Sequence, residues 1–476
     1  MKLSARSRVV CGNTQENAMT VICWFRRVLR LDDHPALVAA AEDGAVIPLV
    51  ILDPAEARAH PASAERQALS LPPLAAALER LGSRLIVRRG DPAEVLEALA
   101  RQTGASVIHA TTGFPFASDD GLEAAAEHGG ARLQLHPLAD LVPRGSVLTG
   151  SGGVYKVFSP FWKAVRQVQI APPLAVPKLT APEDWPDSDG TDWPEARAAM
   201  VRGWDVLARH TRPGEDEAHA RLEEFLEGPL PDYKADRDLP WRPRATSGLA
   251  DALACGEISA RRIWARVQPD YQQGAAGSEH FLSELCWREF ARELMAESPD
   301  LDRTPWREEW TRFPWRGDND DAEAWRRGRT GVPMVDAGMR EMFVTGQMHN
   351  RVRMITGSYL TKHLLTDWKV GLDWFGHCLS DWDAASNAMN WQWVAGCGPD
   401  AAPYFRVFNP ETQAEKFDAE AQYRRYWLDP DAEGAQAFAE AAPRAWKIDL
   451  QDRPKPALSL AEGRQRALDA YQGLKS

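Results

Sequence analysis

The sequence predicts two domains of different fold class: an α/β doubly wound parallel-sheet N-terminal domain and an all-α C-terminal domain. Over residues 19–167, short β-branched runs alternate with helical patterns, whereas helical periodicity dominates over residues 214–476. The segment between them, residues 168–213, is rich in proline and acidic side chains, which is typical of an interdomain linker. A chain of 476 residues is long enough for both domains to bury a core.

The predicted sheet begins with two runs, VICWF (21–25) and AVIPLVIL (45–52). Both are apolar throughout, as parallel strands covered on both faces are. The segment HPALVAAAEDG (34–44) between them predicts a helix that ends at a glycine, and RLIVRRG (84–90) and ASVIHATTG (105–113) continue the alternation. No GxGxxG motif follows the first run, so the pattern does not indicate a Rossmann-type dinucleotide site.

Composition limits the class of protein. Residues 1–18 lack the apolar core of a secretion signal, and we expect a disordered extension or an upstream start there. Six cysteines are scattered without a CxxC pair, which fits free thiols in a reducing cytoplasm better than disulfides or zinc ligands. The sequence contains no run of about eighteen apolar residues, so it predicts no membrane span. We therefore expect a cytoplasmic monomer without a metal site.

Tryptophan is unusually frequent in the second domain. Of the nineteen tryptophans, more than half lie between Trp287 and Trp393. The net charge of −12 argues against indiscriminate nucleic-acid binding. Seven arginines fall within residues 303–329, but acidic side chains are interleaved with them. A phosphate-binding face and a solvated surface are therefore equal alternatives for that window.

Residues 380–393, SDWDAASNAMNWQW, combine two aspartates, two asparagines and three tryptophans in fourteen positions. A surface loop has no need of three indoles. An ordinary core does not bury carboxylates and amides that each require a partner. The segment therefore indicates a functional site in the helical domain.

Seven segments, in order along the chain, resemble the successive motifs of the cryptochrome/photolyase family. They are WFRRVLRLDDHPAL (24–37), GGVYKVFSPFWKA (152–164), TSGLADALACGEISAR (246–261), ELCWREF (284–290), RTGVPMVDAGMR (329–340), MHNRVRM (348–354) and NWQWVAGCGPDAAPYFRVFNPETQAEKFD (390–418). The resemblance implies an α/β antenna domain and a helical domain that holds FAD in a bent conformation, with blue light driving electron transfer. Val28 replaces the aspartate that is usual in the first motif.

The resemblance assigns the contacts to the flavin ring. It implies that Asn387 faces flavin N5 and that Asp381 and Asp383 flank the isoalloxazine, beside Trp382. Arg353 is the expected cationic partner of Asp381. Without the resemblance, an Asp-x-Asp pair is more often a helix N-cap with a solvated carboxylate.

The resemblance also implies a wrapping of the FAD phosphates by hydroxyls and backbone amides. The matching residues are Tyr233, Thr246, Ser247, Gly248 and Leu249. The chain departs from the family here, because Gly248 and Ala250 stand where an arginine and a second serine are usual. Two side-chain contacts to phosphate are therefore expected to be missing.

Three tryptophans match the photoreduction chain of the family: Trp391 nearest the flavin, Trp368 in the middle and Trp315 at the surface. Each one alone would more often be a core residue. Electron transfer between indoles is fast only if they lie close in series. Trp382 could supply a side branch.

A pocket for a pyrimidine dimer flipped out of DNA is the last feature that the resemblance implies. Trp287 and Trp393 match its aromatic walls, and Glu284 and Asn350 match its hydrogen-bonding groups. Met354 matches a further contact to the lesion. Contacts to the DNA backbone match Arg237, Arg288, Arg351 and Gln413. Spacing alone leaves open that these helices are amphipathic and pack Trp and Met into a core.

Two residues distinguish branches of the family. Asn350 after His349 replaces the second histidine of (6-4) photolyases, and Asn387 replaces the aspartate common in plant-type cryptochromes. Both favour a deoxyribodipyrimidine photolyase that repairs cyclobutane dimers in DNA. A cryptochrome photoreceptor that signals through partner proteins is the first alternative, and a flavin-free DNA-binding protein is the second. For the antenna site, ATTGFPFASDD (110–120) leaves methenyltetrahydrofolate, a deazaflavin and an empty site open.

Overall fold

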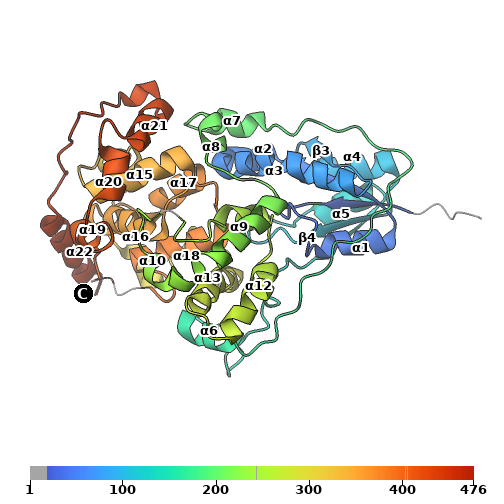
Figure 1. The fold of residues 1–476 in the computed structure, drawn as a ribbon, viewed down its shortest axis with the longest axis horizontal. Helices are drawn as coiled ribbons and strands as arrows, with labels where there is room; N and C mark the ends of the chain where they lie inside the picture. Colours follow the sequence, from blue (N-terminus) through green and yellow to red (C-terminus); the bar gives the residue numbers. More distant parts are fainter. Residues whose placement is uncertain (1–18, 243, 402–403, 405, 476) are drawn as a thin grey trace, which may run out of the picture.

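The structure is a computed structural model that describes residues 19–242, 244–401, 404 and 406–475. Figure 1 shows a sheet with flanking helices at one side of the molecule and a larger group of helices at the other. The extension predicted for residues 1–18 lies outside the described residues. Within the described ranges, no helix is both long and apolar enough to cross a membrane.

The N-terminal sheet is parallel, with the strand order β3-β2-β1-β4-β5. The strands are β1 (Thr20–Trp24), β2 (Ala45–Leu52), β3 (Ile86–Arg89), β4 (Val107–Thr111) and β5 (Arg132–His136). Because β1 pairs with β2 on one side and β4 on the other, the strand order reverses between β1 and β4. At such a point a crevice forms beyond the carboxyl ends of the strands.

Helices cover both faces of this sheet, which confirms the predicted doubly wound fold. One buried cluster joins the sheet to α1 and α3, and another joins it to α4 and α5. The helices are α1 (Pro35–Asp43), α2 (Pro54–Ala59), α3 (Pro61–Arg80), α4 (Pro92–Thr103) and α5 (Leu122–His128). The sequence did not predict β5, because its RLQLH lies at the sheet edge, with Arg132 and Leu135 exposed, and forms no continuous apolar run.

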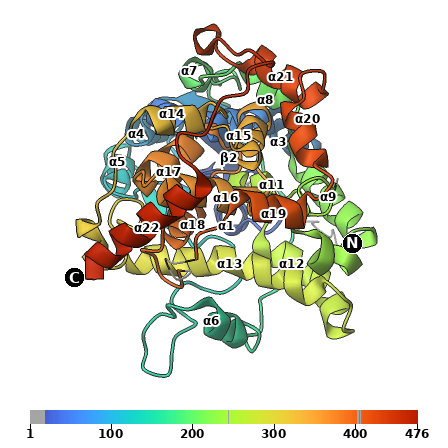
Figure 2. The ribbon, with the colours of Figure 1, turned by 90° about the vertical axis from the view of Figure 1, so that its left-hand side faces the viewer.

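The C-terminal domain is helical, as predicted. Its helices are α9 (Glu215–Glu227), α10 (Tyr233–Asp236), α11 (Ala250–Cys255), α12 (Ala260–Gln272), α13 (Ser278–Glu297), α14 (Asp320–Arg326), α15 (Pro333–Thr345), α16 (Asn350–Ser358), α17 (Trp368–Cys378), α18 (Ala384–Ala395), α19 (Pro410–Phe417), α20 (Gln422–Leu428), α21 (Glu433–Ala441) and α22 (Leu460–Lys475). Short 3₁₀ turns lie at Leu230–Asp232, Glu308–Arg312 and Arg444–Trp446, and a π-helical turn at Tyr359–His363. In Figure 2, α12 and α13 run below α16, α17 and α18.

The hydrophobic packing places the boundary of the N-terminal domain before the predicted residue 167. The buried apolar residues between Leu141 and Val165 belong to the same cluster as the helical domain. They include residues of α6 (Phe158–Val165), in which Phe161 lies 5.4 Å from Phe290 of α13 between ring centroids. The apolar face of α6 is therefore covered by α13 and not by the sheet.

The predicted linker is folded in its second half, where it contains α7 (Pro194–Ala199) and α8 (Trp204–Ala208). Trp193, just before α7, is only 1% exposed. Arg202 is buried and donates hydrogen bonds of 2.6–3.1 Å to backbone carbonyls in the last turns of α15 and α17. The side chains of this segment are thus packed against both domains, which the proline-rich and acidic composition did not reveal.

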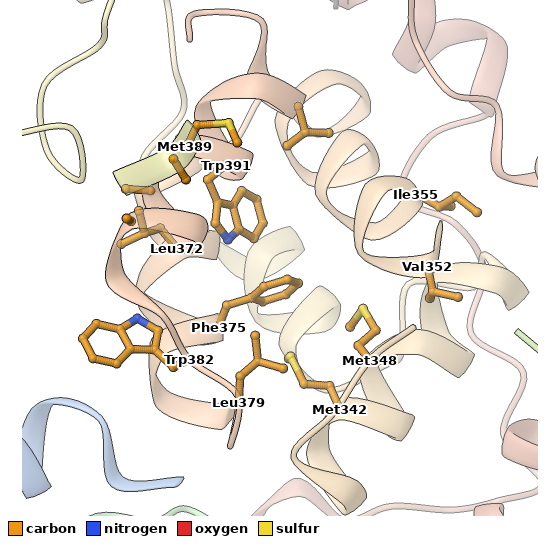
Figure 3. Packing of buried hydrophobic residues seen from close by; sticks show 14 of the residues in the cluster. Met342, Met348, Val352, Ile355, Leu372, Phe375, Leu379, Trp382, Met389 and Trp391 are labelled. Carbon is orange, nitrogen blue, oxygen red and sulfur yellow. The ribbon is translucent and has the colours of Figure 1, made fainter. Parts of the chain in front are cut away.

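Helix α18 carries most of the segment that combines polar and aromatic residues. Asp383 caps its N-terminus by accepting a hydrogen bond from the Ser386 amide at 2.8 Å, and Gly396 ends it in the left-handed region with φ +92°. The helix packs against α13, α16 and α17. Figure 3 shows Trp391 of α18 beside Phe375 of α17. The segment is therefore placed in the interior of the helical domain.

Candidate functional site

A cavity of about 500 Å³ opens into the helical domain. Its wall is formed by the loop before α11, one face of α13, the ends of α15 and α16, and the region from α17 into α18. The predicted site residues that line it are Thr246, Ser247, Gly248, Leu249, Glu284, Trp287, Arg288, Asn350, Arg353, Met354, Asp381, Trp382, Asp383, Asn387, Trp391 and Trp393. Segments nearly 150 residues apart in the chain thus meet around one space.

Six other predicted residues lie outside this wall: Tyr233, Arg237, Trp315, Arg351, Trp368 and Gln413. Tyr233 is buried between Phe225 and Phe281, with centroid distances of 5.4 Å to each. Arg237 forms an ion pair with Glu284, and Arg351 forms one with Asp238 at 2.6 Å. These two arginines therefore lie near the cavity mouth but already have acidic partners.

Asp381 has the partner that the sequence predicts. Its Oδ2 lies 2.6 Å from Nη2 of Arg353, whose Nε donates to the Met348 carbonyl at 2.7 Å. The other oxygen, Oδ1, is buried and has no hydrogen-bond partner among the described residues. A buried acceptor without a donor is costly, so this atom indicates a ligand N–H or O–H in the cavity.

Asp383 is both a helix cap and part of the cavity wall. Besides accepting from the Ser386 amide, its carboxylate lies 3.4 Å from Nη2 of Arg292. Burial alone would raise the pKa of Asp383, but Arg292 and Arg288 hold it below its usual value. Asp383 is thus a helix N-cap, as the alternative reading of the Asp-x-Asp pair predicts. Its carboxylate is however buried, whereas that alternative predicts a solvated one.

The segment at Gly248 receives positive charge from two helices elsewhere in the fold. Arg221 of α9 donates to the Gly248 carbonyl at 2.6 Å and to Asp251 at 2.8 Å, and Arg66 of α3 donates to Asp251 at 2.8 Å. Gly248 itself has φ +62°, which favours glycine. These hydrogen bonds hold the loop in place at Gly248 and Ala250, the two positions whose side-chain contacts to phosphate are expected to be missing.

The opposite part of the wall is apolar. Trp391 is 3% exposed and packs edge to face on Phe375 at 4.9 Å between centroids. Gly371 makes room for it, since a Cβ there would lie 2.1 Å from the indole. Asn387 donates from Nδ2 to the Leu372 carbonyl at 3.2 Å, and its Oδ1 has no partner in the described part of the chain. One amide oxygen is therefore available to a ligand beside an aromatic surface.

The other tryptophans extend from this region in two directions. Trp368 is fully buried at the start of α17, and the Asp367 amide before it donates to the Arg316 carbonyl next to Trp315 at 2.8 Å. Trp315 is half-buried, and its Nε1 is buried without a described partner. Trp382 stacks on His60, which lies between α2 and α3, at 3.4 Å between centroids, and Figure 3 shows it below Trp391 and to the left of Phe375.

The mouth of the cavity is lined by half-buried or exposed groups. Trp287 stacks on Phe158 at 3.8 Å with an interplanar angle of 12°, so one ring face is held. Trp393 and Met354 are also half-buried, and Asn350 is exposed. These four side chains border an open space, and Trp287 and Trp393 also pack against the buried cluster of the helical domain, as the core alternative expects.

Sequence reasoning missed several residues of the wall. They include Arg292, which reaches Asp383, and Glu341, Met348 and Phe375, which line the cavity. Arg292 lies one helical turn beyond Arg288 on α13, and this spacing could have indicated it. Nothing in the local sequence distinguishes the other three from core residues.

Comparison with known proteins agrees with this geometry. Residues 21–181 match the family model described as DNA photolyase, and residues 281–473 match the FAD binding domain of DNA photolyase. A deoxyribodipyrimidine photo-lyase of Agrobacterium fabrum is 38% identical over 96% of this chain and 98% of its own. The chain belongs to the DNA photolyase family.

Other members of the photolyase family are similar over nearly the whole chain. The deoxyribodipyrimidine photo-lyase of Escherichia coli is 35% identical over 96% of this chain and 99% of its own. Among solved structures, a bacterial class III photolyase from Agrobacterium tumefaciens superposes with a TM-score of 0.87 at 36% identity, covering 98% of this chain and 100% of that one. A Synechocystis cryptochrome superposes with a TM-score of 0.82 at 28% identity, covering 95% and 99%.

A second, smaller cavity lies beyond the carboxyl ends of β1, β2 and β4, beside the strand-order reversal between β1 and β4. Its volume is about 60 Å³. Thr112, Gly113 and Phe116 from the predicted antenna stretch line it. The Arg27 guanidinium lies over the Phe116 ring at 4.4 Å and pairs with Glu56 at 2.5 Å. Side chains of the protein itself therefore fill most of this crevice.

Proposed function

We propose that this protein is a light-dependent deoxyribodipyrimidine photolyase, which uses FAD to split cyclobutane pyrimidine dimers in DNA. The observation that carries the proposal is the large cavity of the helical domain, which joins a buried polar end to an open aromatic mouth. The relatives named deoxyribodipyrimidine photo-lyase, similar over the full chain, support it. A cytoplasmic location and a monomeric state are part of the same proposal.

The cavity residues fit an FAD molecule. A volume of about 500 Å³ lies in the range of cofactor sites. Asp381 offers its unpartnered Oδ1 to a donor on the ring, and Asn387 offers its amide oxygen. Thr246 and Ser247 present hydroxyls and backbone amides for phosphate groups, near the Arg221 and Arg66 network. When bound and reduced, FAD supplies a light-absorbing donor of single electrons.

The remaining wall residues bind and orient the lesion in this proposal. Trp287 and Trp393 present flat apolar surfaces for the two unstacked bases, and stacking on an aromatic side chain contributes about 1–3 kcal/mol per base. Glu284 and Asn350 offer hydrogen-bonding groups to the base edges. Met354 excludes water beside them.

DNA binding by an acidic protein needs local positive charge. Arg237, Arg288 and Arg351 lie around the mouth and are proposed to contact backbone phosphates, with Gln413 of α19. Each of the three arginines already has an acidic partner, so DNA must compete for its remaining N–H groups. In the window 303–329, five of the seven arginines also pair with acids, which favours a solvated surface there.

The smaller cavity supports an antenna chromophore only with rearrangement. At about 60 Å³ it is too small for a pterin or flavin ring system unless Arg27 or Phe116 moves. The archaeal photolyase from Sulfolobus tokodaii, whose two FAD molecules are described as implying a novel light-harvesting cofactor, superposes with a TM-score of 0.78 at 28% identity. Methenyltetrahydrofolate and a deazaflavin both remain candidates for this chain.

A cryptochrome photoreceptor is the second candidate, favoured by the similarity to the Synechocystis cryptochrome. Repair of a dimer-containing oligonucleotide under blue light separates the two. The reduced wild-type protein is expected to repair it, and Glu284→Ala is expected to lower the repair rate about 10-fold or more because a hydrogen-bonding group to the lesion is lost. Binding of the damaged DNA without any turnover would instead favour the photoreceptor.

A further inference from the structure

Five carboxyl groups line the large cavity, and they fall into two kinds. Asp251, Glu284, Asp381 and Asp383 each have an arginine as an ion-pair partner. Glu341 of α15 has no lysine or arginine within ion-pair distance in the part of the chain that the structure describes. An arginine partner favours the ionised form of a carboxyl group. Glu341 is therefore the wall carboxyl that is free to hold a proton.

The protein groups that hydrogen-bond to Glu341 are neutral. Its Oε2 accepts a hydrogen bond from the Tyr423 hydroxyl of α20 at 2.5 Å and a long one from the His349 amide at 3.4 Å. Its Oε1 has no hydrogen-bond partner among the described residues. Since the side chain is half-buried and lines the cavity beside Met348, this oxygen is the one available to a ligand.

The electrostatic surroundings favour a proton on this group near neutrality. Burial raises the pKa of Glu341 to about 7, although the Tyr423 hydroxyl, the His349 amide and Arg353 each favour the carboxylate. The charge of Arg353 is shared with Asp381 at 2.6 Å. Burial lowers the pKa of the His349 imidazole to about 4, so it is neutral at pH 7. Burial and the nearby Glu341 and Asp418 raise the pKa of Tyr423 well above its usual value, so its hydroxyl stays a donor.

The proposed chemistry needs such a group. A flavin ring that gains an electron in a water-excluding site gains a basic nitrogen as well, and a proton must come from a nearby acid. The amide of Asn387 cannot supply one at neutral pH, and the other four wall carboxyls are each paired with an arginine, whereas Glu341 is not paired with one among the described residues.

We propose that Glu341 is the proton donor of this cavity, passing the proton on its carboxyl group to the bound flavin ring when the ring is photoreduced. In that step Trp391 loses one electron to the ring and Glu341 loses one proton to it, so the ring gains a hydrogen atom overall. An external thiol reductant then restores the electron of the indole. The Glu341 carboxylate is stabilised by the Tyr423 hydroxyl and the His349 amide until solvent returns a proton. The inference rests on the proposed function for the presence of FAD.

The test is light-induced infrared difference spectroscopy of the FAD-loaded full chain with a thiol reductant. Wild type is expected to lose the carbonyl stretch of a protonated carboxyl group on illumination, and Glu341→Gln is expected to show no such loss. Visible absorption is expected to report protonation of the reduced ring about 100-fold more slowly in Glu341→Gln, as for loss of a general acid. Glu440→Gln, an exposed glutamate on α21, is the matched control and is expected to behave as wild type.

A pH profile distinguishes proton donation from a structural role. In wild type the carbonyl signal is expected to disappear as the pH rises through about 7. Tyr423→Phe removes a hydrogen bond that favours the carboxylate, so it is expected to move this midpoint upward. A wild-type signal and rate in Glu341→Gln would overturn the proposal. Should that variant not retain FAD, an unshifted midpoint in Tyr423→Phe would overturn it equally.

Failure of the proposed function gives a different pattern. A wild-type protein that photoreduces its flavin with loss of the carboxyl signal, but repairs no dimer in the chemically reduced state, would retain the role of Glu341 and exclude repair. A protein that repairs dimers but shows no carboxyl signal in wild type would retain repair and exclude the role of Glu341.

Discussion

The two cavities of this protein lie in different domains and differ in what fills them. The one in the helical domain has a volume of about 500 Å³ and contains unpartnered acceptors such as Asp381 Oδ1. The one at the carboxyl ends of the strands has about 60 Å³, and Arg27 lies across it between Phe116 and Glu56. The first is thus open to a ligand, whereas the second is largely closed by side chains of the protein, although Arg27 Nε and the Thr112 hydroxyl there also lack partners among the described residues. A preformed site binds without the cost of moving side chains.

The largest expected effect comes from breaking the polar end of the large cavity. Asp381→Ala leaves Arg353 without its carboxylate and removes the acceptor offered to the ring. Breaking a buried ion pair costs about 3–5 kcal/mol, so FAD affinity is expected to fall at least 100-fold. Fluorescence titration of the flavin-free protein with FAD measures it. Asp452→Ala, which removes a surface partner of Arg329, is the control, and equal affinities in both variants would contradict a preformed polar end.

The aromatic mouth of the large cavity provides the next test. Trp287→Ala removes a ring that is already held flat by Phe158. Loss of one stacking surface costs about 1–3 kcal/mol, so affinity for dimer-containing DNA is expected to fall about 10- to 100-fold while affinity for undamaged DNA stays the same. Trp204→Ala, an exposed tryptophan on α8, serves as the control in the same binding assay. A uniform loss for damaged and undamaged DNA would argue against a lesion pocket.

The contact between the two cavities is expected to depend on pH. His60 stacks on Trp382, and burial together with Arg27 lowers the pKa of His60 to about 4. In the unfolded chain His60 takes up a proton near pH 6.5, but in the folded protein only near pH 4. The free energy of unfolding is therefore unaffected by His60 above pH 6.5 and falls as the pH is lowered from 6.5 toward 4. At pH 5 the loss is about 2 kcal/mol.

His60→Phe keeps a stacking ring but cannot be charged, so its free energy of unfolding is expected to depend less on pH between 6.5 and 4.5. Denaturant unfolding at several pH values measures the difference. His128→Phe, at an exposed position on α5, is the matched control. A pH dependence identical to wild type in His60→Phe would exclude this histidine as the cause.

The smallest expected effect comes from opening the second cavity. Phe116→Ala removes a half-buried ring that packs against Trp382 and under Arg27. The loss of stability is expected to be about 1–2 kcal/mol, less than for a fully buried phenylalanine. Phe116 does not itself line the large cavity, and Trp382 of that wall keeps its stacking partner His60, so FAD binding is expected to be unchanged. Binding of added methenyltetrahydrofolate is expected to strengthen. Weaker FAD binding would show that the two cavities are not independent.

The sequence alone was sufficient for the fold class and for many, but not all, of the residues around the large cavity. The doubly wound pattern follows from apolar strand runs that alternate with helices, and the segment 380–393 stands out by composition. Of the predicted contacts, the pair Arg353 and Asp381 is confirmed at 2.6 Å. These features depend on neighbouring residues or on sequence motifs, so they can be predicted from the sequence without the tertiary structure.

Only the tertiary structure decided which charges meet. Arg221 reaches the Gly248 carbonyl, Arg221 and Arg66 both reach Asp251 just after that loop, and Arg292 reaches Asp383 across 91 residues. The absence of a cationic partner for Glu341 among the described residues is likewise a property of its surroundings and not of its sequence neighbours. Whether a buried carboxyl group holds a proton depends on the charges within a few ångströms of it, and folding alone determines which those are.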